Sequence, residues 1–522
     1  MTPLFLAKYD IIIVGYGPVG AMLANLLGKY HWKVAVFEQQ TAIYPLPRAV
    51  HLDDESLRIF QATDLHEKIL PHLTSFQKMQ LVEASKQIII EILLGSKDQK
   101  YGFASDFWFF QPKLESILRE GVKRFENISV FEGFEVNNIL QKEEENVLTI
   151  LNTVTQKTNQ IAGKYVVACD GGQSFVRQKL GISMKDFKFN NSWLVVDALL
   201  KNKYTNETAN LPTIHQQICD PKRPTTYVSG HKNHRRWEFM LQKGETKQEV
   251  EKIENVEKWL SKWVNIAKID ILRANVYTFH GLLAKKWQDK GVFLAGDAAH
   301  MMPPFLGQGL CSGFRDAHNL AWKLDAVLAK KASEKLLESY EEERSEHTAA
   351  LIKGAITLGS IVQTTAKMRT FLRNVVLKIA NKIPQAKPII RAAILKKKPL
   401  KKGFLGKNCP QLIGHLFIQP KVLNKEAEKL YLDSYLDNNF VLFLRKNTIT
   451  STPNISYLKE KIDLRILTLH KDMIDDENIL TNWFSKQKVD FVVIRPDKYI
   501  YDAGRLYTLE KVARSLRQQL NV

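Results

Sequence analysis

The first forty residues combine a short apolar run, a glycine-rich turn and an amphipathic stretch. Residues 11–14 are Ile-Ile-Ile-Val, a β-branched run with the length and character of a buried parallel strand. Residues 18–30 then show helical periodicity, and residues 33–37 form a second apolar run. This order of strand, turn, helix and strand predicts a βαβ unit at the start of the chain.

The turn of this unit has the spacing G-x-G-x-x-G, formed by Gly15, Gly17 and Gly20. Glu38 ends the second strand 18 residues after Gly20 (38 − 20), close to the ~20 expected of a dinucleotide fingerprint. Gly15 permits the tight turn, and Gly17 lets the backbone approach a pyrophosphate. The helix that follows offers unpaired N–H groups to phosphates, and Glu38 can accept hydrogen bonds from a ribose. The unit predicts dinucleotide binding and leaves NAD and FAD open.

The pattern further along the chain divides it into parts. Residues 76–101 and 183–281 alternate like strands, whereas 409–522 mixes short strands with helices. Between them, residues 381–408 combine Pro, Gly and many lysines, which is typical of a linker. We therefore expect an α/β protein with a Rossmann-like cofactor domain (1–75, 102–182 and 282–380), an inserted β-sheet substrate domain (76–101 and 183–281), a basic linker (381–408) and a C-terminal α/β domain (409–522).

Composition narrows the class of partner. The 522 residues are 45% hydrophobic and 25% charged, as in ordinary globular proteins, with a net charge of +20. This charge favours anionic partners such as dinucleotides, carboxylate substrates or an acidic membrane surface. No nucleic-acid reader motif is present, so we expect no nucleic-acid partner.

Cysteine usage and apolar run lengths indicate the compartment. The four cysteines are scattered and form no C-x-x-C, which argues against a disulfide framework and against a metal site. The first ten residues lack the features of a signal peptide, and no run approaches the roughly 18 apolar residues of a membrane span. These features predict a cytoplasmic protein without a transmembrane segment.

Two later stretches repeat the design of a buried strand that ends in Asp and Gly. They are "VVACDGGQSFVR", with Asp170, and "VFLAGDAAH", with Gly296 and Asp297. Each alone is equally typical of a strand-end turn in which Asp caps the next helix. In this order after the glycine turn, and with "PRAVHLDDESLRIFQ", "FFQPKLESIL" and "FLGQGLCSGFRDAHNLAWKL", they resemble the FAD-dependent aromatic hydroxylases of the para-hydroxybenzoate hydroxylase type. The likeness runs through almost the whole chain.

The resemblance implies FAD as the cofactor and a role for each matching residue. The glycine turn would hold the FAD pyrophosphate and Glu38 its ribose, and Asp297 would bind the ribityl hydroxyls. Arg48 stands where the family has an arginine near the phosphates, and Gln111 matches a glutamine that contacts the flavin chain. The cofactor-binding set implied in this way is Gly15, Gly17, Gly20, Glu38, Arg48, Gln111, Asp170, Gly296, Asp297, Pro303, Gly307 and Gly309.

The loop from Pro303 to Gly309 would line the flavin ring with backbone groups. A ring that stacks on backbone and moves between positions is incompatible with bulky side chains, which accounts for Gly307 and Gly309. The helix after Gly309 would direct its N-terminus toward the reduced flavin. The family further implies NADH or NADPH as co-substrate, O₂, and a small phenolic substrate, with 3-(3-hydroxyphenyl)propionate or 3-hydroxycinnamate as candidates.

Few ionisable side chains qualify for the chemistry. His51 follows Arg48 by three residues and is the candidate for proton exchange near the flavin, although a packing or capping histidine has the same signature. Arg223, Arg235 and Arg236 could attract a substrate carboxylate or nucleotide phosphates.

Three further points stay open at this stage. The C-terminal domain resembles the thioredoxin-like appendage of phenol-hydroxylase relatives, without a redox cysteine pair, so it would support structure or a homodimer contact. The lysine-rich segment is usually a solvated face, and docking to acidic lipid is the minority interpretation. The alternative functions are hydroxylation of a polyketide-like or antibiotic phenol and, from another class, a non-catalytic flavin-bearing partner protein.

Overall fold

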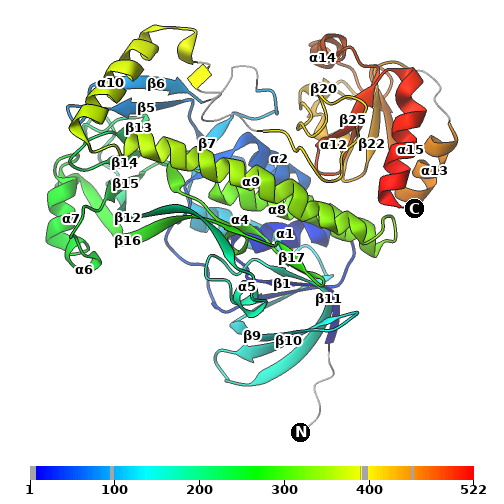
Figure 1. Cartoon of the computed structure of the whole chain (residues 1–522), viewed down its shortest axis with the longest axis horizontal. Helices are drawn as coiled ribbons and strands as arrows, with labels where there is room; N and C mark the ends of the chain where they lie inside the picture. The colour runs from blue at the N-terminus through cyan, green and yellow to red at the C-terminus, as the bar shows by residue number, and fades with distance from the viewer. Residues whose placement is uncertain (1–6, 95–98, 388, 391–397, 448–451, 522) are drawn as a thin grey trace.

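The computed structural model describes residues 7–94, 99–387, 389–390, 398–447 and 452–521 (Figure 1). Its first sheet is built around a parallel core in the order β18-β11-β1-β2-β8. The residues 11–14 are buried at its centre, as expected of a strand covered on both faces. The strands of this core are β1 (Ala7–Val14), β2 (Val34–Glu38), β8 (Ile128–Glu132), β11 (Thr158–Ala168) and β18 (Val292–Leu294).

Two helices cover the carboxyl ends and one face of this sheet. Helix α1 (Pro18–Gly28) begins directly after the glycine turn, and α8 (Gly309–Leu328) packs against it. Helix α8 is buried on nearly every side, and α9 (Lys335–Val362) crosses over it (Figure 1). The glycine turn, the tip of β11 and the tip of β18 therefore meet at one edge of the sheet, because parallel strands end on the same side.

The second sheet is the inserted β-rich region, in the order β19-β16-β12-β15-β14-β13-β5-β6. Strands β12 (Met184–Leu200) and β16 (Ile269–Ala284) form a long antiparallel ribbon that joins it to the first sheet. Strands β5 (Lys78–Val82) and β6 (Ile88–Leu93) come from far earlier in the chain and form its edge. The remaining strands are β13 (His215–Ile218), β14 (Thr225–Val228), β15 (His234–Met240) and β19 (His300–Met301).

One helix lies elsewhere than the domain expectation placed it. Helix α10 (Lys367–Lys382) falls mostly within the stretch assigned to the cofactor domain, yet it packs on β6 at the edge of the second sheet. The expected linker 381–408 does not form one continuous exposed segment. Its start belongs to α10, part of it lies outside the described residues, and Leu400, Phe404 and Leu405 are buried at its end.

The C-terminal part forms a four-stranded mixed sheet in the order β23-β22-β24-β25. Strand β22 pairs in parallel with β23 and antiparallel with β24. This βαβαββα order is the one that a thioredoxin-like domain requires. Its elements are β22 (Val441–Leu444), α13 (Pro453–Ile462), β23 (Arg465–Thr468), α14 (Ile479–Gln487), β24 (Phe491–Ile494), β25 (Ile500–Gly504) and α15 (Leu509–Leu520).

This domain docks on the rest of the protein through buried charges. Glu343 of α9 accepts from both terminal nitrogens of Arg495, at 2.9 and 2.7 Å, and lies 3.0 Å from Lys323. Arg58 binds Asp433 through two parallel hydrogen bonds of 2.7 and 2.8 Å. Because an unpaired buried charge is costly, these pairs fix one docking geometry.

Among the described residues, no helix is long and apolar enough to cross a bilayer, and no group of three or more His, Cys, Asp or Glu side chains could hold a metal ion.

Candidate FAD site

The glycine turn leaves space where a cofactor would lie. Gly15 has φ +99°, and a Cβ there would stand 2.5 Å from the carbonyl oxygen of Cys169. A Cβ on Gly20 would stand 2.0 Å from the carbonyl oxygen of Gly15, so this glycine lets α1 approach the strand. Gly17 differs, because no heavy atom lies within 4 Å of the position of its Cβ. Gly15 and Gly20 are thus required by the protein itself, whereas Gly17 keeps open space beside the start of α1.

The Glu38 carboxylate is held beside this turn. Its Oε2 accepts from the backbone N–H of Tyr16 at 2.8 Å, and its Oε1 accepts from the N–H of Gln40 at 2.9 Å. Each carboxylate oxygen has two lone-pair directions, so both keep acceptor capacity for ribose hydroxyls. The position agrees with the role expected for an acid at the end of the second strand.

Gln111 and Arg48 are coupled through the backbone. Gln111 begins α4 (Gln111–Val122), and its Oε1 accepts from the N–H groups of Arg48 and Ala49 at 2.8 and 2.7 Å. The Arg48 side chain is exposed, stacks over the Tyr44 ring at 5.0 Å and lies close enough to Asp297 to offset, together with His300, part of the rise in pKa that burial causes there. Gln111 therefore positions the segment that carries Arg48, rather than leaving its amide oxygen free.

Asp170 follows β11 and is only partly satisfied. Its Oδ2 accepts from the N–H of Val176 at 3.1 Å, whereas its Oδ1 is buried and has no hydrogen-bond partner. Burial raises the pKa of Asp170 above its usual value. A buried acceptor without a partner is costly in a finished protein, so this atom indicates a ligand or water.

Asp297 lies at the tip of β18 on a short 3₁₀ turn. It is the exposed residue of the run 292–299, yet desolvation raises its pKa. Both facts describe a carboxylate in a recess, reached by solvent but surrounded by protein.

Asp316 of α8 holds this turn in place and is a residue that the sequence analysis missed. Its Oδ2 accepts from the Gly296 N–H at 3.1 Å and contacts Nε2 of His300 at 2.6 Å, and its Oδ1 accepts from Arg344 at 2.8 Å. Burial raises the pKa of Asp316, but His300 and Arg344 lower it by more than burial raises it, so the net pKa lies below its usual value. Asp316 is one of two acids in α8, and its pairing with His300 and Arg344 across the fold has no local sequence signal.

His51 lies under the glycine loop with both ring nitrogens engaged. Nδ1 is 3.0 Å from the carbonyl oxygen of Gly307, and Nε2 is 2.9 Å from Asp106. Burial lowers the pKa of His51, but the hydrogen bonds to Asp106 and Cys311 raise it, and the net pKa lies well above the ordinary value. Gly307 has φ +63°, and a Cβ there would meet the His51 ring at 2.7 Å. His51 thus supports the loop, and its role as a catalytic group stays a prediction.

The three arginines separate in space. Arg223 pairs with Glu245 at 2.5 Å, away from the cofactor recess, and Arg235 binds the Asn206 side chain. Of the three, Arg236 contacts the segment that carries Arg48, where it donates to the carbonyl of Arg48 at 2.9 Å.

Arg236 belongs to a buried cluster that the sequence analysis also missed. Asp197 accepts from Arg236 at 2.8 Å and from Arg273 at 2.7 Å, and both arginines donate to the Pro47 carbonyl. Burial raises the pKa of Asp197, but Arg236 and His234 bring it well below its usual value. The cluster therefore anchors the segment before Arg48 from the side of the second sheet.

An aromatic wall adjoins His51 on the side of the second sheet. The rings of Phe76 and Trp108 stack at 3.8 Å, and Trp108 lies 5.4 Å from the ring of His215. The Nε1 of Trp108 is buried without a hydrogen-bond partner. Flat apolar faces with one unused donor suit an aromatic ring that carries an oxygen acceptor.

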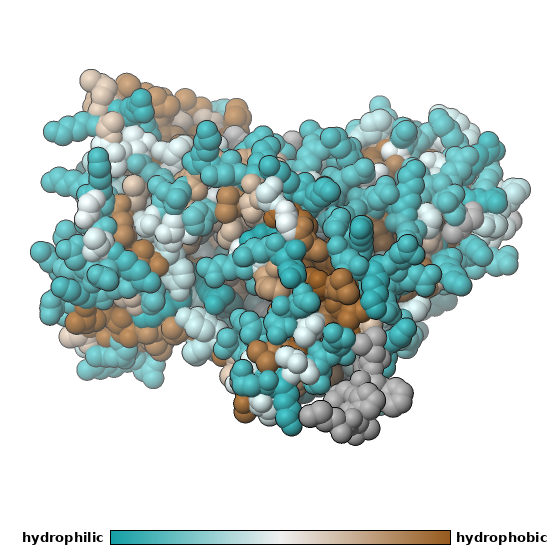
Figure 2. All heavy atoms as spheres, turned by 60° about the horizontal axis from the view of Figure 1, so that its bottom comes forward, coloured by the Kyte–Doolittle hydropathy of each residue, from teal (hydrophilic) through white to brown (hydrophobic). Residues whose placement is uncertain are grey.

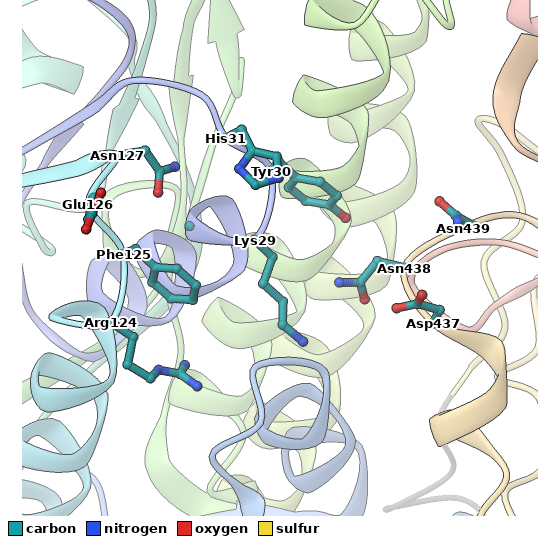
Figure 3. Close-up of a pocket in the computed structure, with 11 residues that line it drawn as sticks. Lys29, Tyr30, His31, Arg124, Phe125, Glu126, Asn127, Asp437, Asn438 and Asn439 are labelled. Carbon is teal, nitrogen blue, oxygen red and sulfur yellow. The ribbon is translucent and has the colours of Figure 1, made fainter.

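An open cleft of about 760 Å³ lies elsewhere, between the end of α1 and the C-terminal domain. Figure 3 shows Lys29 and Phe125 on one side of it and Asp437 and Asn438 on the other. The glycine turn is at the opposite end of α1, about 16 Å away for 11 residues at ~1.5 Å each. This cleft is therefore separate from the candidate FAD site.

Comparison with known proteins decides the family. Residues 8–355 match the model of the FAD binding domain, and residues 414–519 match that of the HcaD C-terminal domain. The 3-(3-hydroxy-phenyl)propionate/3-hydroxycinnamic acid hydroxylase of Escherichia coli O139:H28 is 32% identical over 534 residues, covering 97% of this chain and 94% of that protein. The chain belongs to the FAD-dependent aromatic hydroxylases. It is therefore an enzyme, a flavoprotein monooxygenase.

Solved hydroxylases share the fold over the whole length. The flavin-dependent monooxygenase PieE, in complex with FAD and substrate, has a TM-score of 0.80 at 17% identity and covers 100% of both chains. Aklavinone-11 hydroxylase, in a complex with FAD and aklavinone, also has a TM-score of 0.80 at 17% identity and covers 99% of both chains. The α/β fold, including its C-terminal domain, is thus that of the FAD-dependent hydroxylases.

The residues present fit FAD. The open space at Gly17 and the unpartnered Oδ1 of Asp170 are features that the protein alone does not explain. Asp297 in its recess and Glu38 beside the turn add acceptors for hydroxyl groups. Together they form one edge with places for a pyrophosphate, a ribose and a polyol chain.

Proposed function

We propose that this hydroxylase acts on a small phenolic acid, 3-(3-hydroxyphenyl)propionate or 3-hydroxycinnamate, and uses NADH or NADPH and O₂. The observation that carries the proposal is the relative that is 32% identical over 97% of the chain and is named for these two acids. Bound FAD supplies electron transfer from the nicotinamide nucleotide and activation of O₂. The roles below are those of the chain's own residues.

The aromatic wall orients the substrate ring in this proposal. Phe76 and Trp108 provide stacked faces, and the free Nε1–H of Trp108 donates to an oxygen of the substrate. Burial of these faces excludes water from the reacting ring, which protects a reactive oxygen species from side reactions. Replacing Trp108 by Phe keeps the face and removes the donor, so we expect a KM raised about fivefold with little change in kcat, an effect of roughly 1 kcal/mol.

The glycine loop fixes the reacting geometry. The start of α8 at Gly309 places unpaired helix N–H groups beside the loop, and this positive end stabilises negative charge. His51 and Asp106 support the loop from below through the Gly307 carbonyl. In this arrangement no side chain of the loop itself has to titrate.

The role of His51 can be separated by experiment. If it supports the loop, His51→Asn weakens FAD binding and leaves the pH profile of kcat unchanged. If it exchanges a proton with the substrate, the variant retains FAD and loses one limb of the kcat profile. Asp106→Asn is the matched variant, because it removes only the carboxylate partner of His51 and should reproduce the first outcome.

The main test is turnover with a panel of phenolic acids. NADH and NADPH oxidation is measured beside hydroxylated product, with ¹⁸O₂ as the oxygen source. The proposal expects oxidation stimulated by one of the two named acids and one ¹⁸O atom in the product. Stimulation only by a fused-ring phenol would instead favour the polyketide-like alternative, which the full-length likeness to aklavinone-11 hydroxylase supports. Absence of both signals with every phenol would overturn the proposed substrate class.

A further inference from the structure

Helix α10 is attached to the protein by a mixed side, on which Leu377 packs against a hydrophobic cluster of β5 and β6 and polar side chains make hydrogen bonds. Arg373 donates to the carbonyl oxygen of Cys219 at 3.0 Å. Asn374 donates to Glu83 at 3.0 Å, and Lys378 pairs with the same carboxylate at 2.7 Å. These contacts join α10 to the turn between β5 and β6 and to the residue after β13, at the outer edge of the second sheet.

The opposite side of α10 is apolar and faces outward. Its residues recur at helical spacing and so form one stripe along the helix. They are Met368, Phe371, Leu372, Val375, Val376, Ile379 and Ile383, all exposed. In Figure 1 α10 lies at the upper left edge of the molecule, and in Figure 2 hydrophobic residues gather at that end. A surface helix normally has the reverse orientation, so this stripe needs an occupant.

The charge of α10 itself has one sign, because its sequence contains five Lys and Arg and no Asp or Glu; on the side that contacts the protein, Lys378 is paired with Glu83. Between Glu346 and Glu426, 79 residues contain no Asp or Glu but 16 Lys and Arg. The rest of the chain has 59 Lys and Arg (75 − 16) against 55 Asp and Glu, so this stretch carries +16 of the net +20. Lys367, Arg369 and Lys382 of α10 itself are exposed. The partner that covers the stripe should therefore offer an apolar interior to the stripe and anionic groups to the surrounding lysines and arginines.

We propose that α10 is a membrane-docking helix that lies in the surface plane of a bilayer containing anionic lipid. An exposed apolar stripe flanked by Lys and Arg is the pattern of an interfacial helix, which inserts its apolar face among acyl chains while its cations bind headgroups. A second copy of the chain is the weaker occupant, because symmetric packing of α10 on α10 would bring like charges together. The helix lies on the bilayer and does not span it, in agreement with the lack of a spanning helix among the described residues.

Docking through α10 would hold the β5–β6 edge of the second sheet beside the bilayer. This inference does not depend on the identity of the phenol, because its readout is binding and not turnover.

The test is flotation of the full-length, FAD-loaded protein with vesicles. Vesicles of equal parts phosphatidylglycerol and phosphatidylcholine should bind the protein, and vesicles of phosphatidylcholine alone should bind it about tenfold less. Raising the salt from about 0.1 M to about 1 M should lower binding to the anionic vesicles, because headgroup attraction is screened. Failure to bind anionic vesicles at low salt overturns the proposal.

Matched variants locate the site. Phe371→Ser with Ile379→Ser, whose side chains are 64% and 56% exposed, should lower vesicle binding about tenfold or more. Val154→Ser with Ile253→Ser, at 78% and 54% exposed on other elements, should leave binding unchanged. Both variants are compared at equal FAD content and equal melting temperature. Equal vesicle binding by the two variants overturns the assignment to α10. The proposal is also overturned if the unmodified protein does not bind vesicles but forms a dimer, and the Phe371→Ser, Ile379→Ser variant is a monomer.

Discussion

Two polar regions flank helix α8, and they are built in opposite ways. At the C-terminal interface, the Glu343 carboxylate is enclosed by Arg495, Lys323 and the N–H of Phe404. At the cofactor edge, Asp170 keeps an unpartnered buried oxygen and Gly17 keeps open space. The first region completes itself with the chain's own charges, whereas the second is complete only with a ligand. A binding site is therefore distinguished from a structural contact by buried polar atoms without hydrogen-bond partners, and not by the mere presence of polar residues.

The largest effect is expected from breaking the completed region. Glu343→Gln removes the charge that compensates Arg495 and Lys323, so the free energy of unfolding should fall by about 3–5 kcal/mol. Chemical denaturation followed by tryptophan fluorescence measures this. Asp463→Asn is the matched control, because it breaks the solvent-exposed Lys331–Asp463 contact and should cost less than about 1 kcal/mol. Equal losses in the two variants would contradict the role assigned to burial.

The next effect is a pH dependence beside the aromatic wall. Burial lowers the pKa of His215 to about 4. The unfolded chain has a histidine pKa of about 6.5 and binds more protons between pH 6.5 and 4, so stability falls as the pH drops through this window, by at most about 3 kcal/mol. His215→Gln should remove this part of the loss.

The measurement is the difference in unfolding free energy between the protein and the His215→Gln variant at pH 7.5 and at pH 5. Other buried histidines contribute to both proteins and cancel in the difference. A difference that is the same at the two pH values would show that His215 does not titrate in this window.

A third experiment fills the open region. Gly17→Ala places a methyl group where no protein atom lies within 4 Å, so the apoprotein should unfold at an unchanged temperature. The affinity for FAD should fall about tenfold to a hundredfold, or about 1.4–2.7 kcal/mol, because the methyl group occupies the approach of the pyrophosphate. Fluorescence titration with FAD measures this.

Gly20→Ala is the comparison variant for Gly17→Ala, because it tests a glycine that the protein itself requires. Its Cβ would stand 2.0 Å from the backbone of Gly15, so this variant should lose stability even without FAD. If Gly17→Ala instead lowered the stability of the apoprotein and left FAD affinity intact, the open space would have no connection with the cofactor.

The smallest effect concerns a single interface hydrogen bond. Tyr499→Phe removes the donor to Glu55 at 2.7 Å, but Arg315 still binds this carboxylate. We expect a loss of about 1 kcal/mol in unfolding free energy with unchanged FAD affinity. A loss as large as that of Glu343→Gln would show that the interface acts as one cooperative network.

Local pattern predicted much of the fold. The apolar run, the glycine spacing and the acid of the first βαβ unit are all within 40 residues, and the structure has these elements where periodicity indicated them. The placement of α10 differed because periodicity shows that a helix has an apolar face but not which face the protein contacts. Besides Leu377, its contacts are made by Arg373, Asn374 and Lys378, which in isolation are typical of a solvated side.

Contacts across long sequence separations could not be predicted from the chain alone. Asp106 lies 55 residues from His51, and no local spacing connects them. Arg235 and Arg236 are adjacent on β15, so they point to opposite faces, and only the sheet order shows that Arg236 is the one near the cofactor edge. The residues implied by the family resemblance lie in short sequence motifs and could be found from them. The residues that hold them in place, such as Asp106 and Asp316, are recognised only from contacts across the fold.

The ribbon of β12 and β16 has a mechanical consequence. Strands of 17 and 16 residues extend about 55 Å, and their pairing continues on both sides of register shifts at Asp186/Asn190 and Asp197/Ala198. Because the strands stay paired along most of this length, the ribbon opposes a large hinge motion between the cofactor domain and the second sheet. Access for reactants must come from small displacements of loops or of the prosthetic group. A spin label at each end of the ribbon should then give a single narrow distance distribution throughout the turnover cycle.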